Sequence, residues 1–370
     1  MPATVPTHVV SGATGFVGRA VVLHLLATTN ADIACLVRPS SRPKRTSTRL
    51  VAALADAARA YGYPDSLEPD IARRCHLVPA DLQQSLAGAR RALQRHGVEH
   101  VWHCAGSLRY HDRDRRLIHQ TNVDGTARLL QLAGDVGAAG FHYVSTAYVA
   151  GTSDGLILED RADPAAAQNA YEQSKVRAEE LVLSATGLRT TVLRPSVVIG
   201  HSRTAAVSGN LSGIYSLGFS LGRHARSHRE PGGIRLHMDP GASANLVPID
   251  QVAAETVACG LAGRQHEIFH LVGQPTVTVG ALIEEICVTL GVGPVTFVDH
   301  AAGLRESDRR LAEKMAYYLS YLRGNKVFDR TNTNRVVGTA ADRYAGRPGL
   351  DEVWRWYAER FPSADPVGAR

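Results

Sequence analysis

A tyrosine and a lysine stand four residues apart in the stretch YEQSK, at Tyr171 and Lys175. If the stretch is helical, the two side chains share one face and are neighbours. A free tyrosine titrates near about 10, and a nearby cation stabilises the phenolate and lowers that pKa. The pair could be a proton donor and the cation that tunes it. It could equally be a surface pair that only contributes to a helix.

A second chemical signal is the stretch SGATGFVG, which places Gly12, Gly15 and Gly18 three residues apart. It follows an expected strand and opens an expected helix, which is the context of a dinucleotide fingerprint. Gly12 would make the tight turn, Gly15 would let a pyrophosphate approach the backbone, and Gly18 would let the helix pack on the strand. The helix N-terminus would supply free N–H groups to the phosphates. The alternative is a tight turn that merely needs glycines.

The end of the second expected strand predicts which dinucleotide binds. NAD-preferring folds place an acid there to bind the ribose hydroxyls. This strand ends CLVRPSSR, with Arg38 at that position and no acid before Asp56. An arginine suits the additional phosphate of NADP, so NADP is expected. Four nearby basic residues are candidates for a second contact with that phosphate: Arg42, Lys44, Arg45 and Arg49. For Arg42, Lys44 and Arg45, a solvated surface charge is the simpler interpretation.

Alternating elements must position these groups. Short β-branched runs alternate with helical patterns from residue 7 to residue 200, which predicts an α/β fold with a doubly wound parallel sheet, the Rossmann fold. We expect an NADP-binding domain over 1–200. A smaller C-terminal substrate-binding lobe is expected over 201–370, with some elements returning to the main sheet. The Gly-rich, weakly periodic segment 201–245 is expected to form a mobile lid over the nicotinamide.

Composition excludes several other classes. The 370 residues carry a formal charge of +6, and the basic residues are scattered, which disfavours nucleic acid as a partner. No apolar run is long enough for a membrane span, and the N-terminus lacks the pattern of a signal peptide. The sixteen histidines show no metal-binding spacing, so no metal is expected. The cysteines are expected to be reduced in a cytoplasmic protein: Cys35, Cys75, Cys104, Cys259 and Cys287.

Six motifs occur in an order that resembles one superfamily. They are SGATGFVG, HCAGSLRY, TNVDGT, YVSTAYVAG, YEQSK and LRPSVVIG. Together they are similar to the extended short-chain dehydrogenases/reductases over about residues 7–273. STAYVAG, the insertion that ends in TRL and the late YLRGNKVFDRTNTNRVVG resemble the male-sterility-like branch, which contains fatty acyl-CoA reductases and thioester reductase domains. Segment 201–245 fits no pattern of that branch.

The resemblance assigns roles to the residues. It implies that Tyr171 donates a proton to the substrate oxygen, that Lys175 holds the nicotinamide ribose, that Thr146 hydrogen-bonds the reacting carbonyl and that Asn122 supports the site. Ser145 competes for the hydroxyl role, but it is expected to face the other side of its strand. The implied cofactor contacts are Gly12, Thr14, Gly15, Phe16, Val17, Gly18, Arg38, Arg49, Asp81, Leu82, Ala105, Tyr171, Lys175, Pro195 and Val198.

These roles indicate an NADPH-dependent reductase acting on a carbonyl or a thioester, either an acyl-CoA or a carrier-bound acyl group, with aldehyde or alcohol as product. Arg223 and Arg226 in the lid are candidates to bind an anionic carrier. The candidate partners are an acyl carrier protein and a second copy of the chain. The alternatives are a ketone or aldehyde reductase of the flavonol or sterol type, sugar-nucleotide epimerisation, and a non-catalytic NADP-binding regulator. His103 is interpreted as a packed core residue. The basic run 109–116 is interpreted as a solvated loop and helix start.

Overall fold

The computed structural model describes residues 7–39, 43–209, 211, 213–228, 232–274, 276–339 and 349–361. A seven-stranded sheet has the order β12-β7-β5-β4-β1-β2-β3, and every neighbouring pair is parallel. Its strands are β1 (Thr7–Ser11), β2 (Asp32–Val37), β3 (Cys75–Pro79), β4 (Val98–His103), β5 (Gly140–Val144), β7 (Arg189–Pro195) and β12 (Glu267–Leu271). The expected doubly wound parallel sheet is confirmed.

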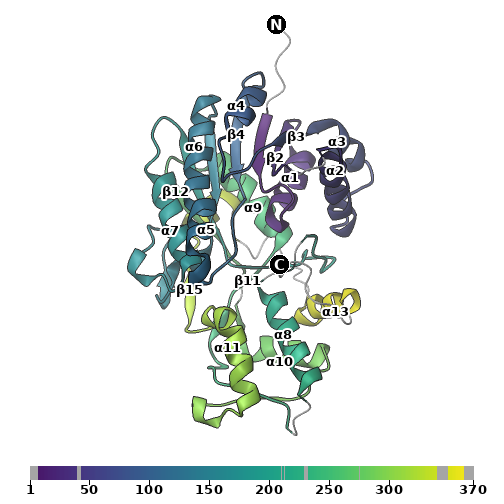
Figure 1. Ribbon diagram of the computed structural model, residues 1–370, viewed down its shortest axis with the longest axis vertical. Coiled ribbons are helices and arrows are strands. Elements are labelled where there is room, and N and C mark those ends of the chain that lie inside the picture. Colours follow the sequence, from purple (N-terminus) through teal and green to yellow (C-terminus); the bar gives the residue numbers. More distant parts are fainter. Residues whose placement is uncertain are drawn as a thin grey trace.

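Helices cover both faces of this sheet (Figure 1). Val10 of β1 packs in one layer and Val9 in the other, because neighbouring strand residues face opposite sides. The layer at Val10 contains α1 (Phe16–Thr28), α2 (Pro43–Ala60), α3 (Leu67–Arg74) and α9 (Ile249–Ala262). The layer at Val9 contains α4 (Ala87–Leu93), α6 (Gly125–Asp135) and α7 (Ala170–Leu183). Burial on both faces explains why the strands read as continuous apolar runs.

A smaller lobe faces the carboxyl ends of the strands and lies below the sheet in Figure 1. Its helices are α8 (Ile214–Ser227), α10 (Val279–Thr289), α11 (Glu306–Ser320) and α13 (Leu350–Arg360). They share one hydrophobic cluster in which Trp354 and Tyr215 are buried. Short strands pair around the lobe: β8 (Val197–Ile199) with β11 (Leu246–Pro248), β9 (Ile234–Leu236) with β14 (Val295–Phe297), β10 (Ser243–Ala244) with β13 (Val277–Thr278), and β6 (Gly155–Ile157) with β15 (Lys326–Phe328).

The chain beyond residue 200 contributes to both bodies. Helix α9 packs with α1, and strand β12 completes the sheet beside β7. Segment 201–245 supplies α8 and β9, and Leu217 and Leu221 of α8 are buried in the lobe cluster. The division at residue 200 and the lid role of 201–245 stay predictions. Residues 210, 212 and 229–231 of that segment lie outside the described residues.

Three local features differ from the sequence-based expectation. The fifth strand ends at Val144, and AYVA (Ala147–Ala150) is a 3₁₀ turn in which Thr146 Oγ1 accepts from the N–H of Tyr148. The helical pattern of residues 115–137 predicts one long helix, but the structure divides it into α5 (Arg115–His119), a π-helical turn (Gln120–Asp124) and α6. Helices α3 and α4 were not expected, since each is short, with eight and seven residues.

Two buried ion pairs connect distant segments. Arg194 of β7 donates through Nε and Nη2 to the two carboxylate oxygens of Glu179 in α7, at 3.0 and 2.7 Å. Arg330 precedes α12 (Thr331–Val337) and bonds Glu255 of α9 at 2.8 Å. Arg330 also donates to the carbonyls of His270 and Val272 at the end of β12. All four charged side chains are at most 3% exposed, so each charge depends on its partner.

A row of imidazoles crosses three strands of the sheet. His8, His100 and His142 come from β1, β4 and β5, and His100 Nδ1 lies 3.0 Å from His142 Nε2. His142 Nδ1 lies 2.8 Å from Thr191 Oγ1. Gly140 makes room for the row, because a Cβ there would lie 2.7 Å from His100 Nδ1. Burial lowers the pKa of His8 and of His100 to about 4, and lowers that of His142 well below its usual value.

Two features are absent from the part of the chain that the structure describes. No helix in the described part of the chain combines the length and the apolar character that crossing a bilayer requires. No group of three or more His, Cys, Asp or Glu side chains among the same residues is arranged to hold a metal ion.

Candidate active site

The glycine loop joins β1 to α1 at the carboxyl edge of the sheet. Gly12 has φ of +74°, which favours glycine, and a Cβ there would lie 2.7 Å from the amide nitrogen of Ala105. A Cβ on Gly18 would lie 2.1 Å from the carbonyl oxygen of Gly12. Gly15 is the N-cap of α1, and no side chain caps that helix end. The tight turn and the close helix packing expected from these glycines are therefore present, and the exposed helix start suits a pyrophosphate.

A cavity of about 340 Å³ opens beside this loop. It collects residues from the loop, from the ends of β4, β5 and β7, from α7 and from the lobe. The candidate site residues that line it are Gly15, Phe16, Val17, Gly18, Thr146, Tyr171, Lys175, Pro195 and Val198. Residues separated by up to about 180 positions in the sequence therefore meet in one space, because parallel strands end at a common edge.

Tyr171 and Lys175 lie in the first two turns of α7, and both are buried. The helix begins there because Asn169 caps it by accepting from the N–H of Glu172 at 3.0 Å. Lys175 donates to the Tyr143 hydroxyl at 3.1 Å and to the Val144 carbonyl at 2.9 Å. Burial lowers the pKa of Lys175 to about 8, so the ammonium remains the main form at pH 7.

The pKa of Tyr171 differs from the sequence-based expectation. We expected Lys175 to lower it, but burial, with Glu172 as a second cause, raises the pKa of Tyr171. The expected lowering is absent because Lys175 is oriented by Tyr143 and Val144, while the phenol has lost its solvent. Tyr171 is consequently a neutral phenol at pH 7, the form that can donate a proton.

Asn122 does not line the cavity but connects the segments that do. Its Oδ1 accepts from the N–H of Ser107, and its Nδ2 donates to the Ser107 carbonyl at 3.1 Å and to Ser174 Oγ at 2.9 Å. Ser174 in turn donates to the Tyr171 carbonyl at 2.6 Å. Asn122 sits in the π-helical turn, which widens the helix locally. It therefore joins the loop after β4 to the helix that carries Tyr171.

Ser145 and Thr146 both line the cavity. The expectation that Ser145 faces the other side of the strand is wrong, because β5 ends at Val144 and the alternation stops there. Thr146 Oγ1 accepts from the N–H of Tyr148 at 3.2 Å. The Ser145 hydroxyl is buried and, within the described residues, has no hydrogen-bond partner. Both hydroxyls are thus available to a reacting oxygen.

The remaining cofactor candidates lie along the carboxyl edge, outside this cavity. Ser11 of β1 pairs with Leu36 of β2, which brings the exposed Arg38 next to the glycine loop. Arg49 is exposed on α2. Gly12 and Thr14 belong to the glycine loop itself. Asp81 and Leu82 follow the end of β3, and Ala105 follows the end of β4. Arg42 and the side chains of Lys44 and Arg45 lie outside the described residues.

A set of tyrosines that the sequence analysis did not select forms the other wall of the cavity. Tyr110 comes from the loop after β4 and Tyr148 from the 3₁₀ turn. Tyr317 and Tyr318 lie in α11, and Tyr321 is its C-cap. For the last three, the available signal was their concentration in AYYLSYL at helical spacing. The run 109–116 was interpreted as solvated, and Arg109 and Arg115 are exposed, but Tyr110 turns toward the cavity.

Other sequence-based expectations have definite positions. His103 is fully buried between Ser11 Oγ at 2.8 Å and Thr126 Oγ1 at 2.9 Å, which confirms a packed core residue. Arg223 and Arg226 are exposed on α8, and neither lines the cavity. Their proposed contact with an anionic carrier stays a prediction.

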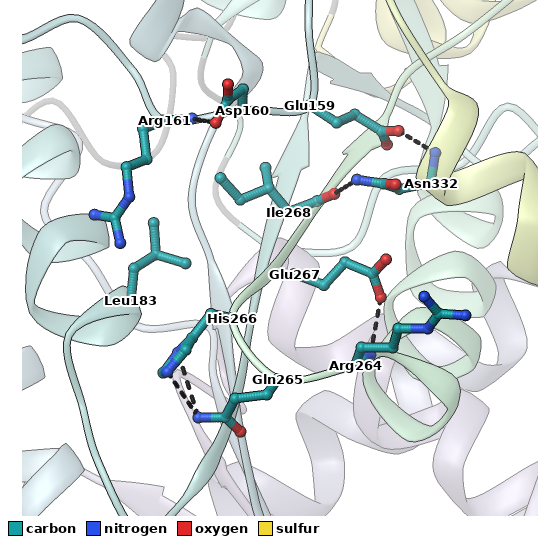
Figure 2. Close-up of a pocket in the computed structure, with 10 residues that line it drawn as sticks. All are labelled: Glu159, Asp160, Arg161, Leu183, Arg264, Gln265, His266, Glu267, Ile268 and Asn332. Carbon is teal, nitrogen blue, oxygen red and sulfur yellow. Dashed lines mark hydrogen bonds between the residues drawn. The ribbon is translucent and has the colours of Figure 1, made fainter.

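A second polar cavity, of about 260 Å³, lies at the start of β12 and holds none of the candidate residues (Figure 2). Its acidic side chains are committed to structure. Glu159 accepts from the Asn332 N–H and from Thr333 Oγ1, and Glu267 pairs with Arg335. These contacts hold β12 and α12 together and leave Glu159 and Glu267 with structural roles. We therefore place the chemistry in the cavity beside the glycine loop.

The sheet order, the glycine loop and the Tyr171–Lys175 pair define the class of extended short-chain dehydrogenases/reductases. The sequence model of the male sterility protein family matches residues 10–256. The chain belongs to that family, and it is an NAD(P)-dependent oxidoreductase of the extended short-chain type. The interpretation as a non-catalytic regulator is not kept.

Individual proteins extend the similarity. Glycine betaine reductase ATRR of Emericella nidulans is 27% identical over 98% of this chain and 29% of its own length. A putative dihydroflavonol 4-reductase of Synechocystis is 29% identical over 52% of this chain and 49% of its own. The terminal R domain from the myxalamid PKS-NRPS pathway has a TM-score of 0.75 at 23% identity, covering 98% of this chain and 92% of that domain. The chain spans less than a third of the length of the first curated relatives.

Proposed function

We propose that the protein is an NADPH-dependent reductase that reduces an acyl thioester. The observation that carries this proposal is one cavity in which Tyr171, Lys175 and two hydroxyls, Ser145 and Thr146, meet the glycine loop. The glycines and the helix start fit a dinucleotide, which supplies the hydride when bound. Reduction is supported by the relative named as a glycine betaine reductase. A thioester held on a synthetase is supported by the similar solved structure named as a thiolation-reductase di-domain from an archaeal non-ribosomal peptide synthetase.

In this proposal Tyr171 and Thr146 act on the substrate oxygen, and Lys175 holds the cofactor. Tyr171 is held as a neutral phenol by its raised pKa and donates its proton as negative charge grows on that oxygen. Thr146 donates a hydrogen bond to the same oxygen, in the manner of an oxyanion hole. Lys175, buried and charged, holds the nicotinamide ribose and places positive charge near Tyr171. Reduction by one hydride and one proton then converts the thioester to an aldehyde and a free thiol.

NADP is the preferred cofactor in the proposal. Arg38 follows β2 next to the glycine loop, where NAD-preferring folds carry an acid. Arg49 on the neighbouring helix α2 is the proposed second contact to the 2′-phosphate. The five cysteines are free thiols, which suits a reducing compartment, and we place the enzyme in the cytoplasm.

The test is single-turnover hydride transfer from NADPH to an acyl thioester, followed by the loss of NADPH absorbance. Tyr171→Phe keeps the ring but removes the acid, and general acid catalysis contributes roughly 10² to 10⁴ in rate. We expect a fall in that range with NADPH affinity retained. Tyr148→Phe is the matched control, because it removes another hydroxyl from the same cavity. A Tyr171→Phe enzyme that transfers hydride at nearly the wild-type rate would refute the assignment.

A second candidate is the reduction of a free ring carbonyl. Its support is the tyrosine wall, which suits a planar ring by stacking, together with the relative named as a putative dihydroflavonol 4-reductase. The same Tyr171, Lys175 and Thr146 would act. Comparing kcat/KM for acyl thioesters, aliphatic aldehydes and ring ketones of matched size separates the two candidates, because each predicts a different preferred substrate.

A further inference from the structure

A buried tyrosine behind the catalytic cavity holds the side chain of Lys175. Nζ of Lys175 donates to the Tyr143 hydroxyl at 3.1 Å and to the Val144 carbonyl at 2.9 Å. The same nitrogen lies 4.6 Å from the centre of the Tyr143 ring. An ammonium has three N–H groups, so two of them are committed to β5. Because Lys175 lines the cavity, the third N–H group is left for a ligand that binds there.

Tyr143 belongs to the sheet and not to the cavity. It is the fourth residue of β5, it is 1% exposed, and it does not line the cavity. His103 on β4 is its strand partner, and the two rings lie 5.4 Å apart between centroids. His103 is itself fixed by hydrogen bonds to Ser11 and Thr126. The phenol therefore has a defined position, from which its oxygen reaches Lys175 without touching a ligand.

The charge of Lys175 depends on few contacts. Burial lowers its pKa to about 8, and the Glu179 carboxylate on the same helix acts in the opposite direction. Glu179 is bonded to Arg194, however, so its charge is already balanced. The other titratable groups around Nζ are neutral near pH 7, because burial raises the pKa of the thiol and of both phenols and lowers that of the imidazole: Cys104, Tyr143, Tyr171 and His103. In the described part of the chain, the Tyr143 hydroxyl is thus the one side-chain oxygen that Lys175 bonds.

We propose that Tyr143 is a positioning residue of the reductase: its hydroxyl keeps the Lys175 ammonium charged and directs the remaining N–H group into the cavity. Without this hydroxyl, the buried ammonium would keep one acceptor, the Val144 carbonyl, and the neutral amine would be favoured. Lys175 would then lose its proton at a lower pH and would lack a fixed orientation. This inference rests on the proposed function, in which Lys175 holds the nicotinamide ribose.

The variant that tests this role is Tyr143→Phe, which keeps the ring and its packing and removes only the oxygen. Tyr143→Met also lacks the hydroxyl and takes its place if the phenylalanine variant does not fold. Tyr61→Phe is the matched control. Tyr61 is buried in the layer on the opposite face of the sheet, and its hydroxyl accepts from the N–H of Ser208 at 3.3 Å.

Two measurements are made on each variant. The chain has four lysines, so NMR of protein labelled with carbon-13 lysine follows the titration of Lys175 directly, and its signal is the one that Lys175→Arg lacks. Fluorescence titrations at a series of pH values then give the dissociation constant of NADPH. The first measurement reports the ammonium itself without any ligand, and the second reports its role in cofactor binding.

We expect Lys175 to titrate near pH 8 in the wild type and in Tyr61→Phe. In Tyr143→Phe it should titrate at least about half a pH unit lower, since a hydrogen bond to the charged form raises the pKa of a base. NADPH affinity should fall above the pKa of Lys175, so this fall should begin at a correspondingly lower pH in Tyr143→Phe.

An unchanged Lys175 titration in the variants that lack the Tyr143 hydroxyl, or an equal shift in Tyr61→Phe, would overturn the role of Tyr143. A shifted Lys175 titration with an NADPH affinity that does not follow it would retain that role and refute the proposed function of Lys175 in holding the cofactor.

Discussion

The row of buried histidines makes a quantitative prediction about acid stability. In the folded protein the pKa of His8 and of His100 is about 4, against 6.5 for a free imidazole. The unfolded chain therefore takes up protons first as the pH falls, and stability present above pH 6.5 is lost between 6.5 and 4. At pH 4.5 each of the two residues costs about 2.5 kcal/mol, a large part of the roughly 5–15 kcal/mol that stabilises a typical protein.

The perturbation is His100→Gln, which removes the central imidazole. The difference in unfolding free energy between wild type and variant should move by about 1.2 kcal/mol per pH unit between pH 6 and 4.5, in favour of the variant. The pKa values of His8 and His142 should also rise in the variant, because the charge of His100 lowers both of them in the wild type. Any packing loss shifts the difference equally at all pH values, so only its pH dependence is informative.

The assay is urea unfolding at four pH values from 7.5 to 4.5, followed by the fluorescence of tryptophan, since Trp102 packs against His142 with ring centroids 4.2 Å apart. His96→Gln is the control, because His96 is exposed. A wild-type minus His100→Gln difference that stays constant over this range would show that the imidazoles are not held neutral by the fold, and the argument would fail.

Three further predictions concern charge and hydrogen bonding. Arg38→Ala should weaken NADPH by about 1.5–3 kcal/mol and leave NADH almost unchanged, in fluorescence titrations of both cofactors; equal losses would contradict the 2′-phosphate contact. Thr146→Val should lower kcat more than Ser145→Ala with NADPH affinity intact, and the opposite order would give the oxyanion role to Ser145. Arg330→Ala should lower the free energy of unfolding by about 3–5 kcal/mol in urea titrations because it leaves Glu255 buried and unpaired, and a loss below about 1 kcal/mol would contradict this.

The fold was predictable because its signals are local and periodic. β1 and the helix after it could be assigned from an apolar run, a glycine loop and a helical pattern, and the crossover rule then leaves few arrangements for the sheet. Helices α3 and α4 escaped notice because seven or eight residues provide too little periodicity. The π-helical turn at Asn122 has no signal in the sequence, since it depends on contacts with Ser107 and Ser174.

The candidate site was only partly predictable, for the same reason. Gly12, Tyr171 and Lys175 belong to motifs whose residue spacing alone predicts their roles. Tyr110 and Tyr317 stand more than 200 positions apart in the sequence, and only the packing of the lobe against the sheet brings their rings together. The pKa of Tyr171 was predicted in the wrong direction because burial, which no spacing reveals, outweighs the nearby cation.

The Arg330–Glu255 pair has a consequence for the order in which the chain can fold during synthesis. Strand β12 and Glu255 leave the ribosome long before Arg330, yet the guanidinium of Arg330 both neutralises that carboxylate and binds the carbonyls at the end of β12. Until residue 330 emerges, closing the sheet edge would bury an uncompensated charge, which is strongly unfavourable. We therefore expect the sheet edge at β12 to be fully stabilised only once residue 330 has been made, after most of the lobe.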